Sequence, residues 1–115
     1  MNEPKLFLFD AGGPVERLFK VWQDVMERPR AKLDMNRQQR LRWALRNYTE
    51  EECEQAIRGC ATSDWHMGRN SRGRKYDDIE LIFRDSSHVE QFIDNHLKAE
   101  TADQELAEWL MEGDQ

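Results

Sequence analysis

Apolar residues recur at intervals of three and four along most of this chain, which is the spacing of one face of an α-helix. The first such stretch follows Pro14, a residue type favoured at the first helical position, and predicts a helix from Pro14 to about Glu27. Its apolar stripe consists of Val15, Leu18, Phe19, Trp22, Val25 and Met26. The Arg28-Pro29-Arg30 segment then interrupts the pattern, because a proline disfavours helix in the residue before it.

Two further helices are predicted in the middle of the chain. Asp34 is a suitable N-cap for a helix from Met35 to about Asn47, with an inner face of Leu41, Ala44, Leu45 and Tyr48. Thr49 and Glu52 have the spacing of a capping box, which predicts a helix from Glu50 to about Cys60. The inward residues of that helix are Cys53, Ala56, Ile57 and Cys60.

The last third of the chain predicts shorter helices. A brief fourth helix is marked by Tyr76, Ile79, Ile82 and Phe83. Ser87 and Glu90 form a capping pair that opens a fifth helix with a core face of Val89, Phe92, Ile93, His96 and Leu97. Thr101 and Gln104 form another pair, which opens either a sixth helix or a frayed tail with Ala102, Leu106, Trp109 and Leu110 on one side.

These patterns predict an all-α fold, a compact bundle of five to six short helices without internal repeats or a membrane span. The chain has 115 residues, a common size for one domain. We expect a flexible leader over residues 1–13, a helical domain over 14–98 and an acidic helix or tail over 99–115. The first residues lack the features of a secretory signal, and two buried thiols suit a reducing cytoplasm, so a cytoplasmic location is expected.

Charge is unevenly distributed along the chain. The net charge is -6, but residues 14–84 carry +3 and residues 85–115 carry -8. A mildly basic body followed by an acidic end is typical of proteins with a nucleic-acid face, a partner-binding tail, or both.

Catalytic and metal-binding signatures are lacking. The three histidines, His66, His88 and His96, belong to no zinc, phosphate-loop or nucleophile motif. The acids of Asp77-Asp78 and of Glu50 to Glu52 are interpreted as helix-start residues rather than as acid/base pairs. We therefore predict a protein that is not an enzyme and has neither a cofactor nor a metal, with a small hydrolase as a distant alternative.

The stretch from Ala61 to Lys75 has no periodicity and is predicted to be a long loop between the third and fourth helices. Cationic residues that can reach phosphates gather in it: Arg69, Arg72, Arg74 and Lys75. A merely solvated loop is the alternative. Trp65 and Met67 are expected to anchor the loop on the core.

The outer face of the second helix adds a second candidate surface. Arg42, Trp43 and Arg46 fall on that face, and a tryptophan between arginines can stack on a base or anchor a protein partner. Alternatively, Trp43 is covered by the leader or by the last helix. In the acidic tail, Leu106, Trp109 and Leu110 either pack within the chain or dock in the groove of a partner.

The segment from Lys20 to Ile93 resembles the conserved C-terminal domain of phage and prophage replication proteins, which is related to the second domain of DnaD-type primosome proteins. The features that carry the resemblance are Trp22, Arg30 with Lys32 and Leu33, Tyr48-Thr49, and above all HMGRN at 66–70 followed by Gly73 and YDDIELIFRD at 76–85. Tyr76 and Ile79 are similar to the aromatic and aliphatic motif of the DnaD-like domain.

In that family the domain usually follows a winged-helix origin-binding domain and helps to bring the replicative helicase to DNA, as a helicase loader does. This chain has no winged helix and carries an acidic extension, so origin recognition is not implied. The resemblance implies binding to single-stranded DNA, to a replicative helicase or initiator protein, or to both.

Two hypotheses follow. The first is a non-enzymatic accessory module of phage or prophage DNA replication, which contacts nucleic acid through the basic loop and the second helix. The second is a protein-interaction module that captures or inhibits a host replication or defence protein through its acidic end and does not bind DNA. Either kind of module can be a homodimer.

Overall fold

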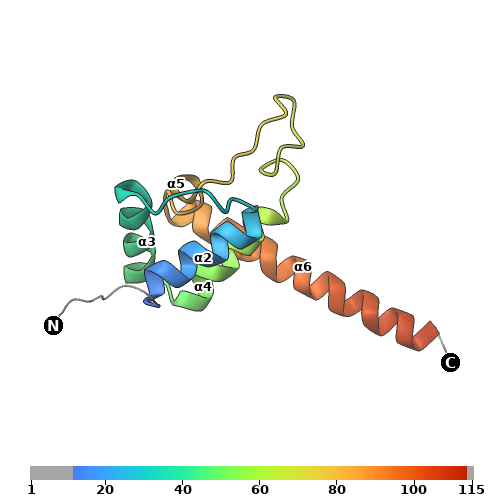
Figure 1. Cartoon of the computed structure of the whole chain (residues 1–115). Coiled ribbons are helices and arrows are strands. Elements are labelled where there is room, and N and C mark those ends of the chain that lie inside the picture. The colour runs from blue at the N-terminus through green and yellow to red at the C-terminus, as the bar shows by residue number, and fades with distance from the viewer. Residues whose placement is uncertain (1–11, 114–115) are drawn as a thin grey trace.

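The computed structural model describes residues 12–113 (Figure 1). Within that range the chain forms helices and no strand, as the all-α prediction requires: α2 (Pro14–Met26), α3 (Met35–Asn47), α4 (Glu50–Ala61), α5 (Ile79–Ile82) and α6 (Ser86–Gly113). The predicted leader lies outside the described residues except for Gly12 and Gly13. No helix of the described chain is long and apolar enough to cross a membrane.

The first three helices begin where their sequence signals predict. Pro14 opens α2, and the Asp34 carboxylate accepts a hydrogen bond from the backbone N–H of Arg37 at the start of α3. Thr49 and Glu52 form the complete capping box of α4. Such caps satisfy backbone donors that the first turn of a helix leaves unpaired, so local sequence is sufficient to place these ends.

The core is centred on α4, which packs mainly against α6 and α2. The predicted inward residues of α4 are all buried, as are the largest core side chains, Trp22, Phe83 and Phe92. One position in this core was not predicted from the sequence. Gly59 faces α6 so closely that a Cβ atom there would lie 1.7 Å from the backbone oxygen of Phe92.

The C-terminal helix differs from the predicted pair of short helices. A single α6 runs from Ser86 to Gly113, and the predicted start at Thr101 is wrong. The Thr101 hydroxyl instead donates to the carbonyl of Leu97, 2.9 Å away, which leaves the helix uninterrupted. The predicted capping pair of Ser87 and Glu90 is also wrong, because the Asp85 carboxylate accepts the N–H of His88 at 2.9 Å.

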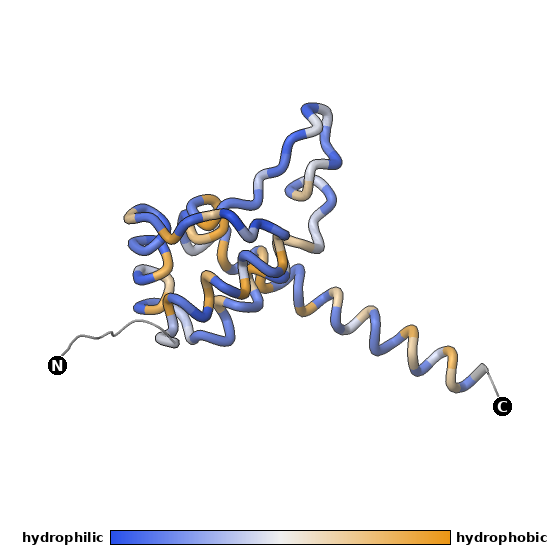
Figure 2. The backbone as a smooth tube through the Cα atoms, viewed as in Figure 1, coloured by the Kyte–Doolittle hydropathy of each residue, from blue (hydrophilic) through white to orange (hydrophobic). Residues whose placement is uncertain are grey.

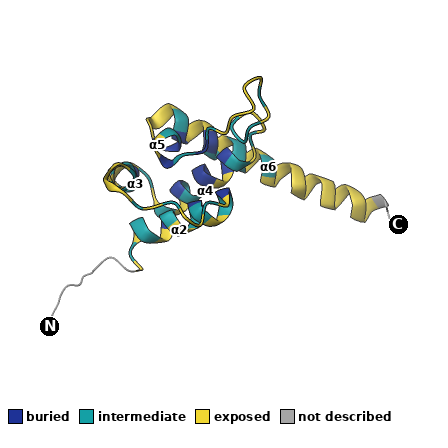
Figure 3. Cartoon of the chain, turned by 45° about the horizontal axis from the view of Figure 1, so that its top comes forward, coloured by how far each residue is buried: buried dark blue, intermediate teal, exposed yellow. Residues whose placement is uncertain are grey.

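The outer half of α6 extends beyond the helical body. Every residue from Glu100 to Glu112 is exposed, and in Figure 3 this half is yellow throughout. Helix α6 therefore has two parts. Its inner half completes the core, and its outer half has no packing partners among the described residues.

The two cysteines are buried, free thiols. Burial raises the pKa of both Cys53 and Cys60 to about 12, and nearby carboxylates act in the same direction. Because the thiolate is the reactive species, we expect a disulfide reagent at pH 8 to modify the native thiols more than about a hundredfold more slowly than the unfolded ones. Absorbance of the released thiol, with and without urea, measures both rates. Equal rates would contradict the buried position.

Candidate nucleic-acid interface

The connection between α4 and α5 projects from the body as an arm (residues 63–76), which rises above the helices in Figure 1. The predicted basic loop therefore does connect the third and fourth predicted helices, α4 and α5. It is no unstructured connection, because residues at its two ends pair with each other. Met67 and Lys75 form an antiparallel bridge, and the N–H of Tyr76 donates to the carbonyl of His66 at 2.7 Å.

The foot of the arm is held on the core by two consecutive residues. The ring of His66 contacts Phe92 edge-on, with centroids 4.9 Å apart, and Met67 packs against the core cluster. Burial lowers the pKa of His66 below its usual value, and the charge of His88 acts in the same direction. Both effects favour the neutral form of His66, whose ring packs edge-on against Phe92.

Asn70 organises the tip of the arm. Its side-chain amide donates to the carbonyls of Trp65 and Arg74, both at 2.7 Å, and its side-chain oxygen accepts the backbone N–H of Arg72 at 2.9 Å. Gly73 completes the turn with a φ of +59°, a conformation that favours glycine. One asparagine thus links both sides of the arm and limits the positions that its cationic side chains can take.

Aromatic side chains form a platform along one side of the arm. The rings of Trp65 and Tyr76 are stacked, with centroids 4.8 Å apart and planes at 14°, and the guanidinium carbon of Arg74 lies 5.8 Å from the Tyr76 centroid. Trp65 was predicted to anchor the loop on the core, but it is 53% exposed. The arm is therefore anchored on the core by His66 and Met67. Trp65 instead presents its indole to solvent beside the cations.

All four predicted cations of the arm, Arg69, Arg72, Arg74 and Lys75, are exposed. Arg69 lies 3.6 Å from Asp64, but both side chains are largely solvated, so this ion pair adds little. Among the ion pairs of residues 12–113, none involves Arg72, Arg74 or Lys75. Three cations are thus available to an anionic partner on one ordered arm.

The second predicted group, Arg42, Trp43 and Arg46, does not join this surface. The projecting part of the arm and α3 lie on different sides of the body in Figures 1 and 3. Trp43 is also not a free outer-face residue. It is half-buried against the core, with the ring of Tyr48 at 6.3 Å and the guanidinium of Arg40 at 5.5 Å from its own centroid. Arg42 and Arg46 are exposed but remote from the arm.

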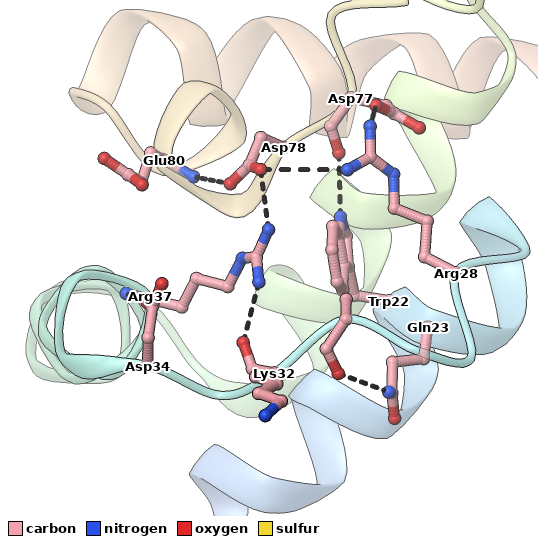
Figure 4. A network of polar contacts seen from close by, with 10 residues as sticks. Trp22, Gln23, Arg28, Lys32, Asp34, Arg37, Asp77, Asp78 and Glu80 are labelled. Carbon is pink, nitrogen blue, oxygen red and sulfur yellow. Dashed lines mark hydrogen bonds and ion pairs between the residues drawn. The ribbon is translucent and has the colours of Figure 1, made fainter.

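The base of the arm is fixed by a polar network that sequence reasoning missed (Figure 4). Asp77, interpreted above as a helix-start residue, is buried and paired with Arg28, and its backbone carbonyl accepts the indole N–H of Trp22 at 2.7 Å. The second carboxylate oxygen of Asp77 has no hydrogen-bond partner within residues 12–113. The sequence does show an acidic residue, Asp77, shortly before the apolar run that begins at Ile79. Its burial could not be predicted from that position, because its ion-pair partner Arg28 lies 49 residues away in the chain.

Asp78 is the cap of α5 and belongs to the same network. Its carboxylate accepts from Arg37 at 2.9 Å and from the backbone N–H of Glu80 at 3.1 Å. Burial acts to raise the pKa of Asp78, but these hydrogen bonds and the charges of Arg37 and Arg28 hold it below its usual value. The network therefore stabilises the ionised form of Asp78. The guanidinium carbons of Arg37 and Arg28 lie 4.9 and 5.5 Å from the ring centroid of Trp22.

The turn before α3 contributes a further cation near the base of the arm. Glu27, Arg28, Pro29, Arg30 and Ala31 line a shallow groove together with Arg37. The pairing of Arg28 with Asp77 places this turn beside the point where the arm rejoins the body. Arg30 is exposed there and enlarges the basic surface beyond the predicted loop.

Within residues 12–113, no group of three or more His, Cys, Asp or Glu residues is arranged to hold a metal ion. The predicted partner-binding residues Leu106, Trp109 and Leu110 lie on the outer half of α6, and each is more than half exposed. The arm and this helix end are thus two exposed features of the described chain with binding chemistry.

Comparison of the chain with models of protein families, with curated proteins and with solved structures finds no match. The resemblance to phage replication domains therefore stays a prediction, and the candidate interface rests on its geometry.

Proposed function

We propose that this protein is a non-enzymatic accessory module of phage or prophage DNA replication that binds single-stranded DNA through the arm. The observation that carries the proposal is the exposed Trp65, stacked on Tyr76 among Arg72, Arg74 and Lys75. Proteins that bind single strands combine cations that follow the backbone with aromatic rings on which bases stack. The replication context comes from the sequence resemblance, whose most specific block, 66–85, forms most of the arm together with α5.

Two features favour a single strand over a duplex. An exposed indole can stack on a base only where that base is not already stacked between its neighbours, as in unpaired DNA. The arm is also an irregular hairpin with neither a helix nor a ribbon of the kind that enters a major groove. A replicative helicase or initiator is the protein partner that the resemblance implies, and it would meet a surface other than the arm.

We expect the double substitution Arg72→Ala/Arg74→Ala to weaken binding of a labelled single-stranded oligonucleotide, and Trp65→Ala to weaken it independently. Each lost phosphate contact should reduce the slope of log K against log salt by about 0.7. Loss of base stacking on Trp65 should cost about 1–3 kcal/mol, with the salt slope retained. Fluorescence anisotropy at several salt concentrations, with single-stranded and duplex probes, measures both effects.

The matched control is Arg42→Ala/Arg46→Ala, which removes the same charge from α3. If binding is specific to the arm, this variant loses much less affinity than the arm variant. Equal losses would indicate diffuse attraction to a basic body, and absence of binding by the unmodified protein at low salt would refute the proposal. All four arginines are exposed, so their replacement should leave the melting temperature nearly unchanged. Thermal unfolding of each variant checks that a loss of binding is not a loss of structure.

A further inference from the structure

The outer half of α6 carries an apolar stripe that nothing in the described chain covers. Leu106, Trp109 and Leu110 are 56%, 68% and 53% exposed. Together with Ala102 and with the half-buried Ala99 just before the exposed half, they repeat at intervals of three and four, and Figure 2 shows apolar positions recurring along this projecting half. We name these five residues the α6 stripe.

The α6 stripe is turned only partly away from the core-facing surface of the same helix. At about 100° per residue, its mean direction lies roughly 80° around the helix axis from that of Val89, Phe92 and His96, and Leu110 lies in line with Phe92. The outer half projects beyond the body, and its residues from Glu100 to Glu112 are exposed. A neighbour that covers the stripe there is therefore not among the described residues.

The spacing of the stripe is that of a helix-pairing seam. Ala99, Ala102, Leu106 and Trp109 occupy alternating intervals of three, four and three, as do the a and d positions of paired helices. In this register the flanking e and g positions between Ala99 and Glu112 are Asp103, Glu105, Leu110 and Glu112, so three of the four are acidic. The segment from Ala99 to Glu112 contains five acidic residues and neither lysine nor arginine.

The charges of the flanking positions identify the kind of partner. A second copy of this chain would place the acidic flanks of two outer halves beside each other, which is unfavourable at e and g positions. A helix with Leu or Ile along its seam and Lys or Arg at the flanking positions would instead cover the stripe and neutralise the acids. Isolated helices of this length are marginal in water, so such a partner would also stabilise the outer half.

From the uncovered stripe, its heptad spacing and its acidic flanks, we infer that the outer half of α6 is a docking helix for a basic amphipathic helix of another protein. This interaction is separate from DNA binding by the arm. Trp109 is its central anchor, since large aromatic residues contribute most at such contacts. The acidic flanks set the preference for a basic partner and oppose self-pairing.

The test uses the full chain and a labelled synthetic peptide of three heptads, with Leu at a and d and Lys at e and g. We expect binding in fluorescence anisotropy, and we expect Leu106→Ala/Trp109→Ala to weaken it by about tenfold or more. Met111→Ala is the matched control. Met111 is 71% exposed on the same half but lies off the stripe, so its truncation should change affinity less than about twofold.

Two further peptides separate specific pairing from charge attraction. A peptide with Glu at e and g should not bind, and one with the same Leu and Lys content in scrambled order should bind at least about tenfold more weakly. Equal binding of the scrambled peptide would overturn the inference. So would a dimer of the full chain in sedimentation velocity that Leu106→Ala/Trp109→Ala abolishes, because a second copy would then occupy the stripe.

The α6 variants should leave oligonucleotide binding unchanged, and the arm variants should leave peptide binding unchanged. Failure of one proposal is therefore distinguishable from failure of the other.

Discussion

Replacing Gly59 with alanine should lower the free energy of unfolding by about 3 kcal/mol and the melting temperature by roughly 12 °C. The added methyl group would lie 1.7 Å from the carbonyl oxygen and 2.6 Å from the carbonyl carbon of Phe92. Both atoms belong to the backbone of α6, so no side-chain rotation can relieve the overlap. The two helices that share the largest interface of the fold would have to separate.

The sign of this effect is informative, because helix propensity alone predicts the reverse. Alanine within a helix is about 1 kcal/mol more favourable than glycine, so an uncrowded Gly59 would make the substitution stabilising. Urea unfolding followed by far-UV circular dichroism measures the difference. Arg58→Ala is the control on the neighbouring exposed residue, where loss of its ion pair with Glu54 should cost less than about 0.5 kcal/mol. A stabilised Gly59→Ala variant would contradict the close approach of α4 and α6.

The second large effect is expected from Arg28→Met, which should lower the free energy of unfolding by about 3 kcal/mol. The substitution keeps an apolar stem but removes the ion-pair partner of the buried Asp77. Among the described residues, no other side chain hydrogen-bonds to the Asp77 carboxylate, and one of its oxygens has no partner there. The variant would therefore bury a charge that nothing compensates.

The converse change should be milder. Asp77→Asn leaves Arg28, whose side chain is 35% exposed and remains in contact with water, so we expect a cost of about 1 kcal/mol. The double variant Arg28→Met/Asp77→Asn removes both charges and should be more stable than the sum of the single changes predicts. Chemical denaturation of the three variants closes this cycle. Equal costs for the two single changes, with additive behaviour, would show that the pair contributes no coupling.

Much of the helical framework was predictable from short stretches of sequence. The bounds of α3 and the capping box of α4 agree with the predictions because caps and apolar periodicity act over a few residues. The same local logic failed at Thr101, where a capping pattern lies inside a continuous helix. A capping sequence allows a helix to begin but does not force one to begin there. A helix that is already nucleated on the core can continue through such a sequence.

The candidate interface was only partly predictable. The four cations of the arm follow from composition, but their support does not. Asn70 joins residues on both sides of the turn, and Trp65 stacks on Tyr76 instead of packing on the core. The expected contribution of Arg42 and Arg46 depended on where α3 lies relative to the arm, which helix periodicity does not specify.

Patterns along the chain were enough to predict the all-α class, the starts of three helices, the inward faces of α2 and α4 and the separation of a basic loop from an acidic end. Four features depend on tertiary contacts: Gly59 meets the backbone of α6, Asp77 is buried against Arg28, the cations of α3 do not join the arm, and no described residue covers Leu106, Trp109 and Leu110. The physical reason is range. Capping and periodicity operate within a turn or two of helix, whereas close packing, buried ion pairs and uncovered faces depend on residues brought together from distant parts of the chain.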